Sequence, residues 1–440
     1  MSVFWTASLV VITALSPAGR ASVARRSVSL WWQRWSRTGT PRVPPRTASQ
    51  LAMAAAALPF EPQPLPHSTA GWFEGWFVRL VDHPGNASVA LVLGSLRKRR
   101  RGRGTKSKEA ERRRQAVVSS DGGVAEWQPP FDEHIMVLAY SDASGHHTHT
   151  LELAGSAVAL SGGRTSPSRA AGPRVRWWSE RHGGLLVEGD SAVIDVSPPG
   201  APRLIANVSG PRVVWSGTAP DRAGPEGWLA QTGMLPCHYF VHSFGSPSSY
   251  RLVRRGERQG GGHGRRVALA HMERNYGEAF PQGYTWAQAT AAGGAAFLVV
   301  TGGLFVVGPL TTLTYIIALR MPATAARDAL EWNFRSTDLD RIVPHRDPCR
   351  GILHLNATSL DGRRSLRLRL SAPPRSFGAR MPIPTTAGFS RMPGCRESYD
   401  ALAELEASER VVAGRWRQRL TLRMPLAALE FGGSWQCAQG

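Results

Sequence analysis

Short apolar runs separated by turn-forming residues limit how this chain can fold. From Gly71 onward, apolar residues occur in alternating or continuous runs, and Gly, Pro, Asp and Ser interrupt them every few residues. Because strand side chains alternate between two faces, such runs favour strands over helices. The 46 glycines and 32 prolines in 440 residues also fit many turns. We therefore predict an all-β fold with minor helix. The expected strands cover 72–81, 88–96, 134–140, 148–153, 184–187, 203–208, 267–272, 351–355, 364–370 and 417–422, and a short helix covers 399–408.

One long stretch without charge is consistent with two different structures. No charged residue occurs in 279–319, and its part 296–319 is long and apolar enough to suggest a membrane helix. Gly302, Gly303 and Pro309 would interrupt such a helix, and the stretch is rich in Val, Thr and Ile. We interpret it as two buried strands joined by a turn at the two glycines, with the membrane helix as the alternative.

The formal net charge of +21 is concentrated in two segments. Residues 1–60 hold seven arginines and no acidic residue, and residues 97–114 hold eleven Lys or Arg against two Glu. Together they supply +16, which leaves +5 for the rest of the chain. The basic charge therefore belongs to a leader and one insert, and we predict no nucleic-acid partner. The insert lies between expected strands, so we interpret it as a solvated hairpin loop rather than a nuclear signal or a patch for anionic membranes.

The N-terminal residues have the composition of a targeting sequence. The first acidic residue is Glu61, and the preceding residues are rich in Arg, Ser, Ala and Pro behind an apolar run at Leu9–Leu15. Arg- and Ser-rich segments that are poor in acids are typical of transit peptides, and an apolar run in front of one would make the leader bipartite. We predict a leader over 1–66 that directs the chain to a plastid. A mitochondrial presequence and an unprocessed tail are the alternatives.

Cysteine and histidine spacing gives no indication of a metal site or of disulfide bonds. The cysteines form no C-x-x-C pair, so neither a structural zinc site nor a disulfide scaffold is predicted. His238 and His242 could share a face of a strand, but no third ligand lies nearby, and we predict no metal. Hydrolase, P-loop and dinucleotide-binding motifs are also absent from the sequence. The four cysteines are Cys237, Cys349, Cys395 and Cys437.

Three segments resemble the tocopherol cyclase-like family. G-W-F-E-G-W-F-V-R-L at Gly71–Leu80 resembles the N-terminal strand of that family. G-M-L-P-C-H-Y-F-V-H-S-F-G-S-P-S-S-Y at Gly233–Tyr250 is similar in a variant form, and H-M-E-R-N-Y-G-E-A-F-P-Q-G-Y-T-W-A-Q-A at His271–Ala289 is, with the first segment, a distinctive match. The tail at Leu426–Trp435 adds to the similarity, which extends over most of the chain after the leader.

The resemblance implies a fold, an activity and a cellular setting. The fold would consist of two lipocalin-like β-barrel halves, which we place at 67–255 and 256–440. The activity would be closure of the chroman ring of a prenylated, phytyl-type benzoquinol, with no cofactor. The implied setting is a plastid, where the protein would associate peripherally with the membrane or with lipid droplets (plastoglobules) and take a prenylquinol lipid as substrate.

The chemistry of ring closure indicates which residues to look for. An alkene carbon must receive a proton from a neutral acid in a dry pocket, and a base must accept the proton of the quinol hydroxyl. Apolar surroundings raise the pKa of a carboxyl group, and aromatic faces stabilise a cation. In a strand, Trp72, Glu74 and Trp76 share one face, which gives a carboxyl group between two indoles. The alternative is a Glu paired with an arginine, with the tryptophans as ordinary core.

A second candidate group follows from the third matching segment. His271 and Glu273 share a strand face and could relay a proton, or they could belong to a buried polar network. His238 lies on a further strand face that could also contribute to the catalytic site. A non-catalytic isoprenoid-binding protein and a hydratase remain alternatives to the cyclase. The predicted catalytic residues are Glu74, His238, His271 and Glu273, and the predicted substrate-binding residues are Trp72, Trp76, Tyr276, Tyr284 and Trp286.

Overall fold

A computed structural model describes most of the chain after residue 70, within the compact unit Pro59–Gly440. The predicted leader over 1–66 and nearly all of the 97–114 insert lie outside the described residues. The described ranges are 71–98, 131–142, 145–164, 173–210, 214–215, 224–231, 235–254, 264–278, 280–307, 310–325, 328–411 and 414–437.

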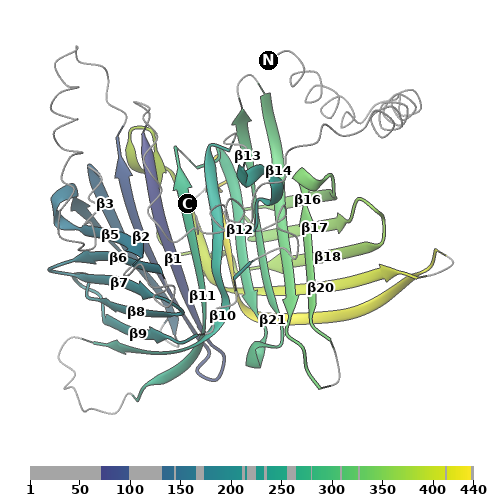
Figure 1. Cartoon of the computed structure of the whole chain (residues 1–440), viewed down its shortest axis with the longest axis horizontal. Coiled ribbons are helices and arrows are strands. Elements are labelled where there is room, and N and C mark those ends of the chain that lie inside the picture. Colours follow the sequence, from purple (N-terminus) through teal and green to yellow (C-terminus); the bar gives the residue numbers. More distant parts are fainter. Residues whose placement is uncertain are drawn as a thin grey trace. The chain divides into compact units, whose positions relative to one another are not determined.

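The described residues form two antiparallel sheets, and their only helices are short 3-10 turns. This confirms the predicted all-β class and the two β-barrel halves. The first sheet has the strand order β4-β3-β2-β1-β11-β10-β9-β8-β7-β6-β5 (Figure 1). Its strands are β1 (Trp72–Asp82), β2 (Ala87–Arg97), β3 (Glu133–Asp142), β4 (Gly145–Ala154), β5 (Ala159–Arg164), β6 (Pro173–Ser179), β7 (Gly183–Glu188), β8 (Ser191–Val196), β9 (Arg203–Val208), β10 (Cys237–Val253) and β11 (Arg266–Gly277).

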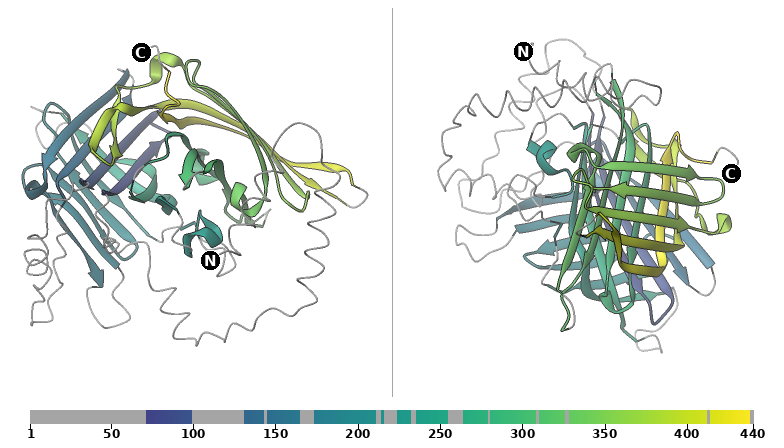
Figure 2. Two further views of the ribbon diagram at one scale, coloured as in Figure 1. Left: turned by 90° about the horizontal axis from the view of Figure 1, so that it is seen from above. Right: turned by 90° about the vertical axis from the view of Figure 1, so that its right-hand side faces the viewer.

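The second sheet has the order β15-β14-β13-β12-β21-β20-β18-β17-β16, with β19 paired to β20. Both sheets curl strongly, as Figure 2 shows. The strands of the second sheet are β12 (Gly283–Thr290), β13 (Phe297–Val307), β14 (Leu310–Met321), β15 (Leu330–Arg335), β16 (Arg341–Asp347), β17 (Ile352–Thr358), β18 (Arg364–Ser371), β19 (Met381–Thr385), β20 (Gly388–Arg410) and β21 (Trp416–Gly433). The 3-10 turns are η1 (Gly155–Ala157), η3 (Gly227–Gln231), η4 (Ala292–Gly294), η5 (Ser336–Asp338) and η6 (Pro374–Ser376).

Each sheet buries an apolar core on its inner face, and a third apolar cluster lies between the sheets. Alternation along β1 explains how one strand serves two cores. Trp76 and Val78 point into the core of the first sheet, whereas Phe77 packs against the cluster between the sheets. A strand that is buried on both faces has a nearly continuous apolar sequence, which is the pattern of this segment.

The boundary between the sheets does not coincide with the predicted domain boundary at residue 256. Strand β11 pairs with β1 on one side and with β10 on the other, so it belongs to the first sheet. The change of sheet therefore falls after Gly277 and before β12. The predicted boundary thus falls between β10 and its antiparallel partner β11, inside the first sheet.

The uncharged stretch forms strands β13 and β14, as predicted, but the turn prediction was wrong. Gly302 and Gly303 lie inside β13, and the strands connect at 308–309 instead. A Cβ atom on Gly302 would lie 2.2 Å from the ring of Tyr315, so the glycine makes room for an aromatic side chain. Among the described residues, no helix is long and apolar enough to cross a membrane.

The helix predicted over 399–408 is also wrong, because these residues belong to strand β20. Their composition favours a helix, but every second residue from Ala401 to Ala407 is buried in the core of the second sheet. Hydrogen bonding to β18 and β21 fixes this segment as a strand, and tertiary pairing therefore overrides local propensity.

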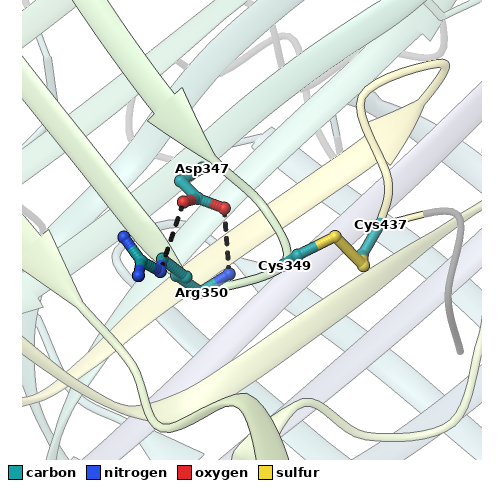
Figure 3. Close-up of a disulfide and its surroundings, with 4 residues drawn as sticks. All are labelled: Asp347, Cys349, Arg350 and Cys437. Carbon is teal, nitrogen blue, oxygen red and sulfur yellow. Dashed lines mark hydrogen bonds and ion pairs between the residues drawn. A yellow bond between two sulfur atoms is a disulfide. The ribbon is translucent and has the colours of Figure 1, made fainter.

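A disulfide joins Cys349 to Cys437, contrary to the prediction from cysteine spacing (Figure 3). The two cysteines are 88 residues apart in sequence, so no short motif could reveal the pair. The bond attaches the residues after β21 to the turn between β16 and β17. The same tail is also held by Trp435, whose ring lies 3.8 Å from the Arg346 guanidinium.

We expect the Cys349→Ser variant to be less stable by about 4 kcal/mol, because the bond closes a long loop in the unfolded chain. Urea unfolding with and without a reducing agent would measure this effect. Since either substitution breaks the same bond, Cys349→Ser/Cys437→Ser should lose no more stability than the single variant. Equal midpoints for reduced and oxidised wild-type protein would contradict the prediction.

Candidate functional site

The pairing of β1 with β11 divides the predicted site residues between two faces of the first sheet. Glu74 lies opposite Tyr276, and Phe77 lies opposite Glu273. Opposed residues share a face, so Glu74 and Glu273 point to opposite sides. We call the group on the inner face of the first sheet the inner cluster and the group between the sheets the intersheet cluster. The inner cluster contains Trp72, Glu74, Trp76, His238, Arg274 and Tyr276, and the intersheet cluster contains Arg79, Tyr239, His271, Glu273, Tyr284, Trp286, Glu397, Tyr399 and Glu430.

In the inner cluster, Glu74 is ion-paired with a buried arginine. An oxygen of Glu74 lies 2.9 Å from a guanidinium nitrogen of Arg274. The guanidinium also lies over the rings of Trp76 and Tyr276, at 5.5 and 5.1 Å from their centroids. This is the Glu–Arg pair with core tryptophans that the sequence left open as the alternative. A carboxylate held by a guanidinium is suited to binding and structure rather than to donating a proton.

His238 lies on the same inner face and pairs with a different carboxylate, that of Glu226. Its Nδ1 lies 2.9 Å from the carboxylate of Glu226, and its ring stacks on Tyr276. Glu226 also accepts a hydrogen bond from the backbone N–H of Tyr239, which fixes the carboxylate next to β10. The structure thus brings together Trp72, Glu74, Trp76, His238 and Tyr276, but separates them from the other predicted residues.

In the intersheet cluster, one oxygen of Glu273 receives three hydrogen bonds. His271 Nε2 lies 2.5 Å from Glu273 Oε1, Trp286 Nε1 donates to it at 3.0 Å, and the Tyr239 hydroxyl donates to it as well. The predicted His–Glu pair is therefore present and buried. His271 Nδ1 is buried without a hydrogen-bond partner. Burial and the neighbouring Glu273 raise the pKa of Tyr239 well above its usual value, so this hydroxyl remains a donor.

The intersheet cluster also contains Glu397, which the sequence analysis did not identify. Its Oε2 accepts a hydrogen bond from the Tyr399 hydroxyl at 2.5 Å, and its Oε1 is buried without a partner. Burial is the main cause that raises the pKa of Glu397 well above its usual value, and repulsion by Glu430 adds to it. The raised pKa favours the protonated form of Glu397, which is the form that a general acid needs.

Glu430 lies directly across from Glu397 on the neighbouring strand β21. Directly opposed side chains in an antiparallel sheet lie close together, so the two carboxyl groups interact strongly. The Tyr284 hydroxyl donates to Glu430 Oε1 at 2.6 Å. Burial also raises the pKa of Glu430. The predicted substrate-binding residue Tyr284 thus contacts an acid rather than the His271–Glu273 pair.

Arg79 connects the two sheets at this site. From β1, its guanidinium donates to Ser88 Oγ at 3.1 Å, to the backbone and side-chain oxygens of Gln288 on β12, and to the carbonyl of Leu426 on β21. It also lies over the ring of Tyr399, 5.7 Å from the centroid. Burial lowers the pKa of Arg79 to about 10, so the side chain is still charged at neutral pH.

The charge balance of the intersheet cluster favours a stored proton. The carboxyl groups of Glu273 and Glu397 are buried and that of Glu430 is half-buried, and all three face one guanidinium and one imidazole. Burying unbalanced charge is costly. A proton on Glu397 reduces that cost. Trp286 and Tyr399 supply aromatic faces, and the His271–Glu273 pair supplies a proton acceptor. The cluster thus combines an acid with a raised pKa, a His–Glu pair and aromatic surfaces, which match the groups required for protonating an alkene. In the described part of the chain, no group of three or more His, Cys, Asp or Glu is arranged to hold a metal ion.

A cavity of about 150 Å³ lies away from both clusters. It opens at the end of the first sheet where β1 turns into β2, between two tyrosines and several arginines. No predicted site residue lines it. Its lining residues are Ala87, Tyr140, Ser141, Pro202, Tyr250, Arg251, Leu252, Arg254, Gly264 and Arg266.

Comparison with known proteins gives no family assignment. No protein-family model matches the chain, and no curated protein matches it in sequence. Among solved structures, similar folds include CghA bound to Sch210972 (11% identity, TM-score 0.44, covering 84% of this chain and 89% of that chain). Kievitone hydratase from Nectria haematococca is also similar (8% identity, TM-score 0.42, covering 83% and 89%), as is a protein assigned as AttH from Nitrosomonas europaea (12% identity, TM-score 0.40, covering 86% and 98%). Similarities at this level do not determine what the chain does.

Proposed function

We propose that this chain is a tocopherol cyclase-like enzyme that closes the chroman ring of a prenylated benzoquinol in its intersheet cluster. The observation that carries the proposal is the state of Glu397. This carboxyl group is buried, its burial raises its pKa, and one of its oxygens has no hydrogen-bond partner. A neutral carboxylic acid between aromatic rings is the proton donor that an alkene requires.

Each step of the proposed reaction has a candidate residue. Glu397 transfers its proton to the less substituted alkene carbon, and the π electrons form the new C–H bond. The tertiary cation that results is stabilised by the faces of Trp286 and Tyr399 and by the excess of carboxyl groups. A lone pair of the quinol hydroxyl then forms the C–O bond, and the hydroxyl proton passes to the His271–Glu273 pair. Return of one proton to Glu397 completes an isomerisation with no net gain or loss of atoms.

The substrate and the location remain part of this proposal. A phytyl-type prenylquinol fits the family resemblance, and its apolar tail fits a site between two apolar sheets. The Arg-rich sequence of residues 1–60 supports import into a plastid. Peripheral association with the plastid membrane or with lipid droplets would give access to such a substrate.

Mass spectrometry of products tests the proposed reaction. Purified full-length chain would be incubated with a panel of prenylquinols that differ in ring methyls and tail saturation, without nucleotide or added metal. We expect a chroman of unchanged mass and shifted retention time. A product heavier by one water would identify a hydratase instead. Binding of the quinols, detected as quenched tryptophan fluorescence, without any product would identify a non-catalytic carrier and overturn the cyclase.

A further inference from the structure

The hairpin of β13 and β14 extends beyond the strands on either side of it. The pairing of β13 with β14 continues to Val307 and Leu310. By contrast, β12 pairs with β13 only as far as Gly303, and β15 pairs with β14 only from Ile316 onward. Among the described residues, 304–307 and 310–313 therefore pair only with each other, apart from the backbone N–H of Gln282, which donates to the carbonyl of Leu304. Figure 1 shows both strands projecting at the top of the sheet.

The projecting ribbon contains no charged side chain. Its sequence is L-F-V-V on one strand and L-T-T-L on the other, within the uncharged stretch 279–319. Phe305 is half-buried, Thr312 is exposed, and Leu313 is 40% exposed. An isolated two-stranded ribbon is marginally stable in water unless one of its faces is covered. The ribbon therefore suits an apolar partner.

Exposed apolar side chains continue from the ribbon around the short turn η5. The backbone N–H of Tyr315 donates to Ser336 Oγ, which places η5 beside the ribbon. Trp228 is 49% exposed, and its Nε1 donates to a carbonyl of η5. Leu339 follows η5 directly and is 54% exposed, and Leu360 is 66% exposed. We call Trp228, Leu313, Leu339 and Leu360 the apolar end patch.

Acidic and basic side chains both lie beside the apolar end patch. Asp361, next to Leu360, is exposed and accepts hydrogen bonds from Ser359 Oγ and from the backbone N–H of Arg363. Asp338 is ion-paired with Arg335, and Asp340 accepts hydrogen bonds from two backbone N–H groups, so both acids are engaged by the protein. Arg341 and Arg363, which flank the patch in sequence, are exposed. The patch therefore consists of a tryptophan and leucines, with arginines and hydrogen-bonded or ion-paired acids beside them.

We propose that the apolar end patch and the projecting ribbon bind a lipid surface that carries anionic headgroups. Exposed indole and leucine side chains enter the boundary between headgroups and acyl chains, while arginines stay at the headgroups. The ribbon extends about four residue pairs, or roughly 14 Å, which reaches the acyl boundary but cannot span a core of about 30 Å. The binding is therefore peripheral. Such binding would bring the protein to molecules dissolved in the lipid, whether or not the protein catalyses ring closure.

Vesicle co-sedimentation of the full-length chain tests this surface. The vesicles would be phosphatidylcholine alone and phosphatidylcholine with phosphatidylglycerol. We expect Trp228→Ser/Leu313→Ser to partition at least tenfold more weakly than wild type, because two apolar side chains would no longer be removed from water on binding. The matched control is Val267→Ser/Met392→Ser, which changes two apolar residues that are each 72% exposed outside the patch.

All variants keep the Arg-rich residues 1–60, so electrostatic binding through them is the same in every arm. Arg341→Gln/Arg363→Gln should weaken binding to the anionic vesicles only, since its effect depends on headgroup charge. Circular dichroism would confirm that each variant is folded. The proposal is overturned if the Trp228→Ser/Leu313→Ser variant binds like the control. It is also overturned if light scattering shows dimers of wild type that this variant loses, because the patch would then bind a second copy.

Discussion

Glu397→Gln should abolish turnover of a prenylquinol while leaving its binding nearly unchanged. Glutamine has the shape of the protonated acid and can still accept the hydrogen bond from Tyr399, so the packing around it should survive. It cannot release a proton to an alkene carbon. Loss of a general acid typically lowers the rate by about 10²–10⁴-fold. Single-turnover product analysis would measure the rate, and tryptophan quenching would measure the binding.

Glu404→Gln is the matched control, since Glu404 lies on the same strand β20 and forms a partly exposed pair with Arg423. It should react at the wild-type rate. Glu74→Gln distinguishes the two clusters: if the chemistry takes place between the sheets, the folded fraction of this variant still turns over. Full activity in Glu397→Gln together with none in folded Glu74→Gln would move the acid to the inner cluster.

The pH dependence provides a second measurement for the same residue. Burial raises the pKa of Glu397, and only its protonated form donates. The wild-type rate should therefore be constant at low pH and fall as pH rises through that raised pKa. Any residual activity of Glu397→Gln should not show this fall of the rate with rising pH. A wild-type rate that increased with pH over the same range would indicate a base instead of an acid at this position.

Sequence reasoning predicted which residues share a face of one strand, but not how two strands combine. Period-two alternation correctly put Trp72 with Glu74 and His271 with Glu273. Whether those two faces coincide depends on the register of β1 against β11, strands nearly 200 residues apart. A shift of one residue would have put both acids on the same side. No local pattern carries that information, so the sequence could not show that the two candidate groups lie on opposite faces of the sheet.

Glu397 was missed because its surroundings come from distant parts of the chain. It precedes a segment whose composition favours a helix, and Glu430 lies in the C-terminal tail. The alternation of Glu397 and Tyr399 at strand spacing was the one available signal. The raised pKa of Glu397 depends on burial against another sheet, and sequence does not show that burial. The same limit applies to the Cys349–Cys437 bond, which joins residues far apart in the chain.

Arg79→Met should destabilise the protein by about 3–5 kcal/mol, which is the usual cost of removing one partner from a buried charged network. The methionine fills part of the volume but donates no hydrogen bonds. The oxygens of Gln288 and the carbonyl of Leu426 would then be buried without their donor. The carboxyl groups of Glu397 and Glu430 would also lose the only arginine of the intersheet cluster.

Urea unfolding followed by tryptophan fluorescence would measure the effect of Arg79→Met. Arg203→Met is the control, because Arg203 forms a partly exposed ion pair with Asp195 and such pairs contribute at most about 1 kcal/mol. Arg79→Lys separates charge from geometry: an ammonium keeps the charge, but it lacks the planar fork that reaches β12 and β21 together. If the sheets are joined mainly through this guanidinium, Arg79→Lys should recover only part of the lost stability. An Arg79→Met variant as stable as the Arg203→Met control would show that this guanidinium does not hold the sheets together.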